Sequence, residues 1–121
     1  MSTLKSGVDL IEVDRLEKAI ERHGDRFLHR IYTDKELVQL KDNLPSLASR
    51  WAAKEAVAKA LGTGIGDVSW QEIEILRGPS KEPILNLYGA ALRLAEESGI
   101  QHWSVSLSHT HAHALAMVVA T

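Results

Sequence analysis

A carboxylate and an ammonium group stand four residues apart, at Glu55 and Lys59, in a segment built almost entirely from small apolar residues. At this spacing on an α-helix, the two side chains share one face. Ala48 and Ala52 fall on the same face, so we expect no bulky side chain to block a charged ligand there. An isolated Glu-to-Lys pair is more often a helix-stabilising contact of about 0.2–0.5 kcal/mol, so other residues must decide its role.

Asp9 is the second residue that invites a chemical explanation. It interrupts an apolar, β-branched run at residues 7–13, and Asp is disfavoured within strands. A structural hydrogen bond to a neighbouring turn would explain it. So would a divalent cation, because Mg²⁺ prefers oxygen ligands and is usually held by one or two carboxylates together with substrate phosphates. Pairing with Glu55 favours the cation.

Two further patterns carry weaker signals. His109, His111 and His113 repeat at a spacing of two and would share one face of a continuous strand, as a transition-metal site requires. A turn expected near residues 110–111 interrupts that geometry and favours surface or phosphate-contacting histidines. The glycine-rich segment at residues 62–67 follows a helix and lacks the P-loop pattern, so it predicts a left-handed helix end.

The hydrophobic pattern predicts both strands and helices. Strands are expected at about residues 7–13, 71–76, 84–87 and 103–108, with a final strand to 119 across the turn. Helices are expected at about residues 15–23, capped by Asp14, from a capping box at Thr33 to 41, at 47–61, and at 88–97. Because strands and helices mix without regular alternation, we predict an α+β fold. A largely antiparallel sheet would pack against a long central helix, in one domain spanning residues 1–121.

Composition excludes several classes of protein. The chain is 45% hydrophobic and 25% charged, has a net charge of -2 and contains no cysteine. Disordered and fibrous proteins, disulfide scaffolds and thiolate zinc sites are thereby excluded, and bulk nucleic-acid binding is disfavoured. With no signal peptide or membrane span in the sequence, we expect a cytoplasmic protein. A local basic surface for an acidic partner is still possible, from Arg15, Lys18, Arg22, Arg26, Arg30, Lys35 and Lys41.

Several motifs resemble, in order and spacing, those of the short holo-acyl-carrier-protein synthases, which are 4′-phosphopantetheinyl transferases. They are GVDLIEVDR at 7–15, RF at 26–27 with IYT at 31–33, RWAAKEAVAKALGTG at 50–64, and SLSH at 106–109. The resemblance covers essentially the whole chain. It departs from the family at Lys5, where glycine is frequent, and at Trp51, where phenylalanine is common.

The resemblance implies an activity and a role for individual residues. The 4′-phosphopantetheine arm of coenzyme A would pass to a serine of apo acyl carrier protein, with Mg²⁺ as cofactor and release of adenosine 3′,5′-bisphosphate. Asp9 and Glu55 would bind Mg²⁺, and Glu55 and Lys59 would be catalytic. The expected coenzyme A contacts are Arg50, Lys54, Gly62, Thr63, Gly64 and His109. The expected carrier-protein contacts are Arg15, Arg22, Arg26 and Phe27. The family also implies a homotrimer with active sites at the subunit interfaces.

The sequence leaves alternatives open. The serine proton could pass to Glu55 or to a metal-bound water, and Lys59 could stabilise or protonate the departing phosphate. A non-catalytic module that docks an acidic protein is one rival function, and a metal protein built on the three histidines is another. The carrier, and a role in fatty-acid or specialised metabolism, are undetermined.

Overall fold

The computed structural model describes residues 3–121, so the first two residues of the expected domain lie outside the described residues. No helix within this range is long and apolar enough to cross a membrane. The elements in chain order are β1 (Lys5–Glu12), α1 (Val13–His23), α2 (Asp25–Ile31), α3 (Asp34–Leu40), α4 (Leu44–Ala60), the 3₁₀ turn η1 (Trp70–Glu72), β2 (Ile73–Arg77), β3 (Pro83–Leu87), α5 (Gly89–Glu97), β4 (Trp103–His109) and β5 (His113–Ala120).

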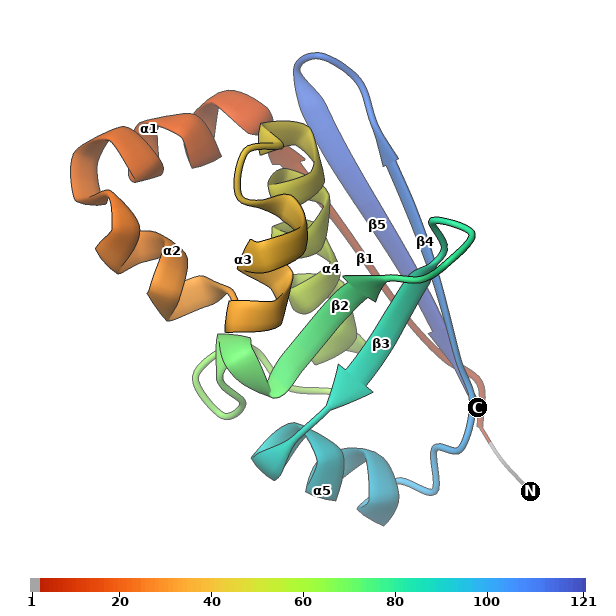
Figure 1. Cartoon of the computed structure of the whole chain (residues 1–121). Helices are drawn as coiled ribbons and strands as arrows, with labels where there is room; N and C mark the ends of the chain where they lie inside the picture. Colours follow the sequence, from red (N-terminus) through yellow and green to blue (C-terminus); the bar gives the residue numbers. More distant parts are fainter. Residues whose placement is uncertain (1–2) are drawn as a thin grey trace.

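Antiparallel pairing organises the described strands into two sheets. One has the order β1-β5-β4, and the other is the β2-β3 hairpin. Helix α4 lies between the larger sheet and helices α1 to α3 (Figure 1). The prediction of an α+β fold with antiparallel sheets is therefore confirmed.

Helix α4 begins three residues earlier than the sequence pattern suggested. The Asn43 side chain accepts a hydrogen bond from the Ser46 backbone N–H at 3.1 Å, and Pro45 fits within the first turn. Ala48 and Ala52 are fully buried in the core. The expectation that these two residues leave an open approach for a ligand is therefore wrong, because both side chains pack within the protein.

Strand β1 lies directly against α4. A Cβ atom on Gly7 would lie only 1.9 Å from the backbone oxygen of Ala56, so only glycine allows this approach. Side chains alternate along a strand, and the inward face of β1 carries Gly7, Asp9 and Ile11. The contact therefore sets how close Asp9 lies to the helix.

The start of the first helix differs from the prediction. Helix α1 begins at Val13, and Asp14 lies within its first turn rather than at its cap. The Asp14 carboxylate instead contacts Lys18 Nζ at 2.9 Å. Helix α2 was not predicted, because its seven residues are too few to show a clear period. Gly24, with φ at 59°, joins it to α1.

The outer face of the larger sheet carries an apolar patch on β1 and β5 that is uncovered within the described chain. Val8 pairs with Met117 and Leu10 pairs with Leu115 across β1 and β5. These four side chains are 54%, 49%, 61% and 39% exposed, respectively. A contiguous apolar patch on a sheet is a common mark of a protein interface.

Candidate functional site

Asp9, Glu55 and Lys59 converge where β1 crosses α4. The Lys59 ammonium donates to Asp9 Oδ1 at 3.1 Å and to the Val8 carbonyl at 2.8 Å. The Lys59 side chain is 52% exposed and the Asp9 side chain 18% exposed. The strand acid and the two helix residues singled out in the sequence thus meet at one partly open site.

Glu55 sits in a surrounding that opposes its ionisation. Partial burial raises the pKa of the Glu55 carboxyl, and the nearby charge of Asp9 raises it further, against the opposing effects of Lys59 and Arg15. A cation between the two carboxylates would offset the effect of the Asp9 charge on Glu55. We therefore regard Asp9 and Glu55 as the pair suited to hold a metal ion.

The donor set fits magnesium better than a transition metal. Within residues 3–121, no group of three or more His, Cys, Asp or Glu side chains is arranged to hold a metal ion. Mg²⁺ seldom uses an all-protein cage, because it keeps waters and takes phosphate oxygens alongside one or two carboxylates. The two carboxylates of Asp9 and Glu55 match this preferred coordination of Mg²⁺.

A second, basic pocket of about 540 Å³ lies elsewhere on the chain. Arg50 and His109 line it together with Arg77 and Lys81 from the β2-β3 hairpin. Arg50 is only 6% exposed, and its Nε has no hydrogen-bond acceptor within the described chain. Burial lowers the pKa of the Arg50 guanidinium, and the like charge of Arg77 lowers it further. A pocket lined by buried and exposed cations is suited to an anionic ligand.

Sequence reasoning missed Arg77 and Lys81. Arg77 ends strand β2 and donates to Ser46 Oγ at 3.4 Å, while Lys81 occupies the hairpin turn with φ at 67°. A cation that directly follows a predicted strand was the available signal. No spacing rule links that hairpin to Arg50 on a distant helix.

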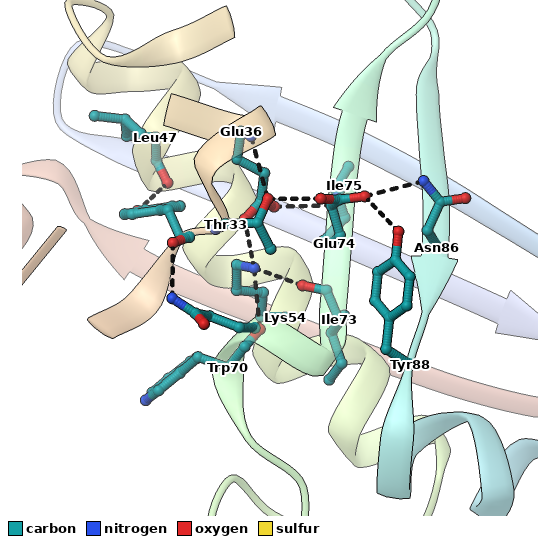
Figure 2. A network of polar contacts seen from close by, with 12 residues as sticks. Thr33, Glu36, Leu47, Lys54, Trp70, Ile73, Glu74, Ile75, Asn86 and Tyr88 are labelled. Carbon is teal, nitrogen blue, oxygen red and sulfur yellow. Dashed lines mark hydrogen bonds and ion pairs between the residues drawn. The ribbon is translucent and has the colours of Figure 1, made fainter. Parts of the chain in front are cut away.

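Lys54 faces neither the Asp9–Glu55 site nor the basic pocket, contrary to the expectation that it contacts coenzyme A. Its side chain is fully buried, and its ammonium donates to Glu36 Oε1 at 2.8 Å, to the Trp70 carbonyl at 3.1 Å and to the Ile73 carbonyl (Figure 2). Burial lowers the pKa of Lys54, while the charge of Glu36 opposes that shift. Because its three protons are already taken, none is left for a phosphate.

The glycine loop ends α4 as expected. Gly62 has φ at 81°, its N–H donates to the Lys59 carbonyl at 3.0 Å, and the Thr63 N–H donates to the Ala58 carbonyl at 3.0 Å. Gly62 and Gly64 are exposed directly beyond the turn that carries Lys59. Their contact with coenzyme A stays a prediction.

The residues expected to bind the carrier protein gather on α1 and α2. Arg15 and Arg22 line a groove of about 540 Å³, and Arg26 and Phe27 line a neighbouring hollow of about 410 Å³. These two helices connect to the site through an aromatic contact. The Phe27 ring meets the Trp51 ring edge-on at 5.6 Å between centroids, and Arg15 Cζ lies 5.6 Å from the Trp51 ring centroid.

The three histidines are split by the turn. His109 ends β4, His111 lies in the turn and His113 begins β5, and all three are exposed. As noted above, no described set of such side chains is placed to hold a metal ion. The histidine-based metal protein is therefore not favoured.

Comparison with known proteins identifies the family of this chain. The sequence pattern of the 4′-phosphopantetheinyl transferase superfamily matches residues 5–118, and the chain belongs to that superfamily. Within it the chain groups with the holo-[acyl-carrier-protein] synthases, which confirms the resemblance seen in its motifs.

Three relatives illustrate the similarity. The holo-[acyl-carrier-protein] synthase of Dehalococcoides mccartyi is 53% identical, over 97% of this chain and 98% of the relative. The holo-[acyl-carrier-protein] synthase of Herpetosiphon aurantiacus is 50% identical, over 96% of this chain and 97% of the relative. The crystal structure of the Helicobacter pylori holo-[acyl-carrier-protein] synthase in complex with coenzyme A is 35% identical, with a TM-score of 0.87 over 96% of this chain and 99% of that one.

Proposed function

We propose that this chain transfers the 4′-phosphopantetheine group of coenzyme A to a serine of an apo acyl carrier protein, with Mg²⁺, and releases adenosine 3′,5′-bisphosphate. The observation that carries the proposal is the meeting of Asp9, Glu55 and Lys59 at the crossing of β1 and α4. Membership of the superfamily supports the same reaction.

The chemistry asks for charge neutralisation and alignment. The serine oxygen forms a bond to the phosphorus that carries pantetheine, and the bond from that phosphorus to the bridging oxygen breaks. Asp9 and Glu55 would hold Mg²⁺, which when bound supplies positive charge to the diphosphate. Lys59 is exposed enough to reach the departing phosphate and stabilise its new charge. The serine proton passes to Glu55 or to water beside it.

The anionic end of coenzyme A fits the basic pocket. Arg50, Arg77, Lys81 and His109 would contact its phosphates. That pocket and the Asp9–Glu55 site are lined by different residues of one chain, with none in common. A second copy of the chain would bring one pocket beside the other site.

The uncovered sheet face supports assembly as a homotrimer. Val8, Leu10, Leu115 and Met117 form an apolar patch that a second copy would cover. The basic surface on α1 and α2 would then dock the carrier protein, since carrier proteins of this kind are acidic. We expect the enzyme to work in the cytoplasm.

Mass spectrometry tests the reaction directly. Incubation with coenzyme A, Mg²⁺ and an apo carrier protein should add one phosphopantetheine to the carrier, and the Asp9→Ala variant should add none. A carrier that binds the wild-type chain but never gains mass would instead identify a non-catalytic docking module. Comparing several carriers in the same assay identifies the preferred one.

The assembly has its own test. Met117→Glu should convert the trimer to monomers and abolish transfer, because a buried unpaired carboxylate in an apolar interface is costly. Val38→Glu is the matched control, since Val38 is 87% exposed on α3, away from the sheet. Light scattering measures the mass of each. A Met117→Glu trimer with full activity would refute the assembly.

A further inference from the structure

The buried charges around Lys54 have no part in the chemistry proposed above. Lys54 and Glu36 are both fully buried, and each proton of the ammonium has an acceptor: Glu36 Oε1, the Trp70 carbonyl and the Ile73 carbonyl. The acceptors come from α3, from the first residue of η1 and from the first residue of β2 (Figure 2). Lys54 thus ties α4 to three other elements at a single point.

Glu36 completes the connection. Its Oε1 accepts from the Thr33 N–H at 2.9 Å, and its Oε2 accepts from the Ile75 N–H at 2.8 Å. A neighbouring buried carboxylate, Glu74, has its own partners. Burial opposes its ionisation, but hydrogen bonds from Thr33, Asn86 and Tyr88 outweigh that effect and lower the pKa of Glu74. Buried ion pairs often contribute little net stability, so this arrangement calls for a reason other than stability.

Helix α4 offers few other features that would fix its rotation. Its packed surface consists largely of alanines, whose methyl groups form only shallow ridges against neighbouring elements. On the β1 side, the closest approach is backbone against backbone, at Gly7 and Ala56, and the half-exposed Lys59 ammonium adds hydrogen bonds to β1. Large interlocking side chains, which normally hold a helix in register, are few along this surface, and the main one is Trp51, whose ring contacts the rings of Phe27 and Trp70.

Lys54 and Glu55 are consecutive, so their side chains leave the helix roughly 100° apart. Any rotation or slide of α4 that moves Glu55 relative to Asp9 must also pull the Lys54 ammonium away from its three acceptors. The Trp70 carbonyl that Lys54 holds also belongs to a residue whose ring lies 6.3 Å from the Trp51 ring, centroid to centroid. Trp51 in turn lies beside Arg15, one of the charges that act on Glu55.

We propose that Lys54 is a positioning residue, whose three hydrogen bonds fix the rotation and axial position of α4 and so hold Glu55 where one divalent cation can contact both it and Asp9. This inference rests on the proposed metal site at Asp9 and Glu55. It gives Lys54 a role through the helix backbone rather than through contact with substrate.

The test uses a double variant. Lys54→Met alone would leave the Glu36 carboxylate buried and unpaired, which can prevent folding, so Lys54→Met is combined with Glu36→Gln. Binding of Mn²⁺, with coenzyme A present and no carrier, is followed by electron paramagnetic resonance. We expect the double variant to keep a cooperative thermal transition and to bind Mn²⁺ at least about tenfold more weakly, as with other residues that orient metal ligands indirectly.

Two control variants separate positioning from general stability. Glu36→Gln alone keeps the bonds from Lys54 to Trp70 and Ile73, its amide oxygen can still accept from the ammonium, and the charge of Glu74 continues to favour the charged form of Lys54. This variant should bind Mn²⁺ nearly as wild type does. Leu40→Ala removes a buried side chain on α3; it should lower the thermal midpoint without weakening Mn²⁺ binding.

The inference would be overturned if the double variant bound Mn²⁺ with wild-type affinity, or if Leu40→Ala lost as much affinity as the double variant. A double variant that does not fold would also overturn it, because the ion pair would then serve folding. Failure of the proposed function looks different. In that case the wild-type protein itself would show no Mn²⁺ binding that Asp9→Asn removes.

Discussion

Glu55→Gln should abolish phosphopantetheine transfer while leaving the fold intact. The substitution keeps the shape of the side chain but removes a charge that the metal ion needs. Loss of about 4 kcal/mol of charge stabilisation in the transition state corresponds to roughly a thousandfold lower kcat. Rates measured with saturating coenzyme A and Mg²⁺ would show it, with Glu96→Gln on α5 as a control of unchanged rate.

The same variant should be as stable as the wild type without metal, or more so. Because the folded protein raises the pKa of Glu55, this group contributes stability at low pH that is lost as the pH rises through its folded-state pKa. Glutamine does not ionise, so the Glu55→Gln variant does not lose this stability as the pH rises. The variant should therefore be more stable than the wild type at neutral pH, and the difference should vanish below the ordinary pKa of Glu. Thermal midpoints measured across pH without metal would show this. A variant that is both active and less stable would contradict the assignment of Glu55.

Lys59→Ala should lower kcat by roughly a hundredfold or more and change the KM for coenzyme A far less. Its ammonium lies beside Asp9 and is half exposed, so removing it disturbs no core packing. An interaction made mainly in the transition state lowers kcat and kcat/KM together. Steady-state kinetics would separate the two effects. A raised KM with unchanged kcat would show instead that Lys59 only binds substrate.

Lys59→Arg distinguishes charge stabilisation from proton donation. Arginine keeps the positive charge but is effectively never deprotonated in proteins. We expect this variant to recover much of the rate lost in Lys59→Ala, because stabilisation of the departing phosphate is the role we assign. Arg93→Ala, at an exposed position of α5, is the control and should keep the wild-type rate. An inactive Lys59→Arg would point to proton donation.

Local patterns were enough to predict the part of the site that depends on spacing within one element. Glu55 and Lys59 share a helix face because of their separation along the chain, and Asp9 stood out because its polarity conflicts with its strand. That β1 and α4 lie side by side was not contained in either pattern. It came only with the resemblance to a known family, and Gly7 supplies its physical basis.

Lys54 and Arg77 show why the rest could not be predicted. A lysine in an apolar helix can face solvent or the interior, and the outcome for Lys54 depends on Glu36 and on two carbonyls more than fifteen residues away along the chain. Arg77 joins Arg50 only because the β2-β3 hairpin folds over the start of α4. Both placements depend on long-range tertiary contacts, which the hydrophobic periodicity of the sequence does not predict.

The contact between Gly7 and the Ala56 carbonyl limits how this scaffold can be redesigned. Any larger residue at position 7 would push β1 away from α4 and increase the distance between Asp9 and Glu55, even where the chain still folds. Mutant libraries aimed at new coenzyme A analogues should therefore hold that glycine constant and diversify the pocket walls instead.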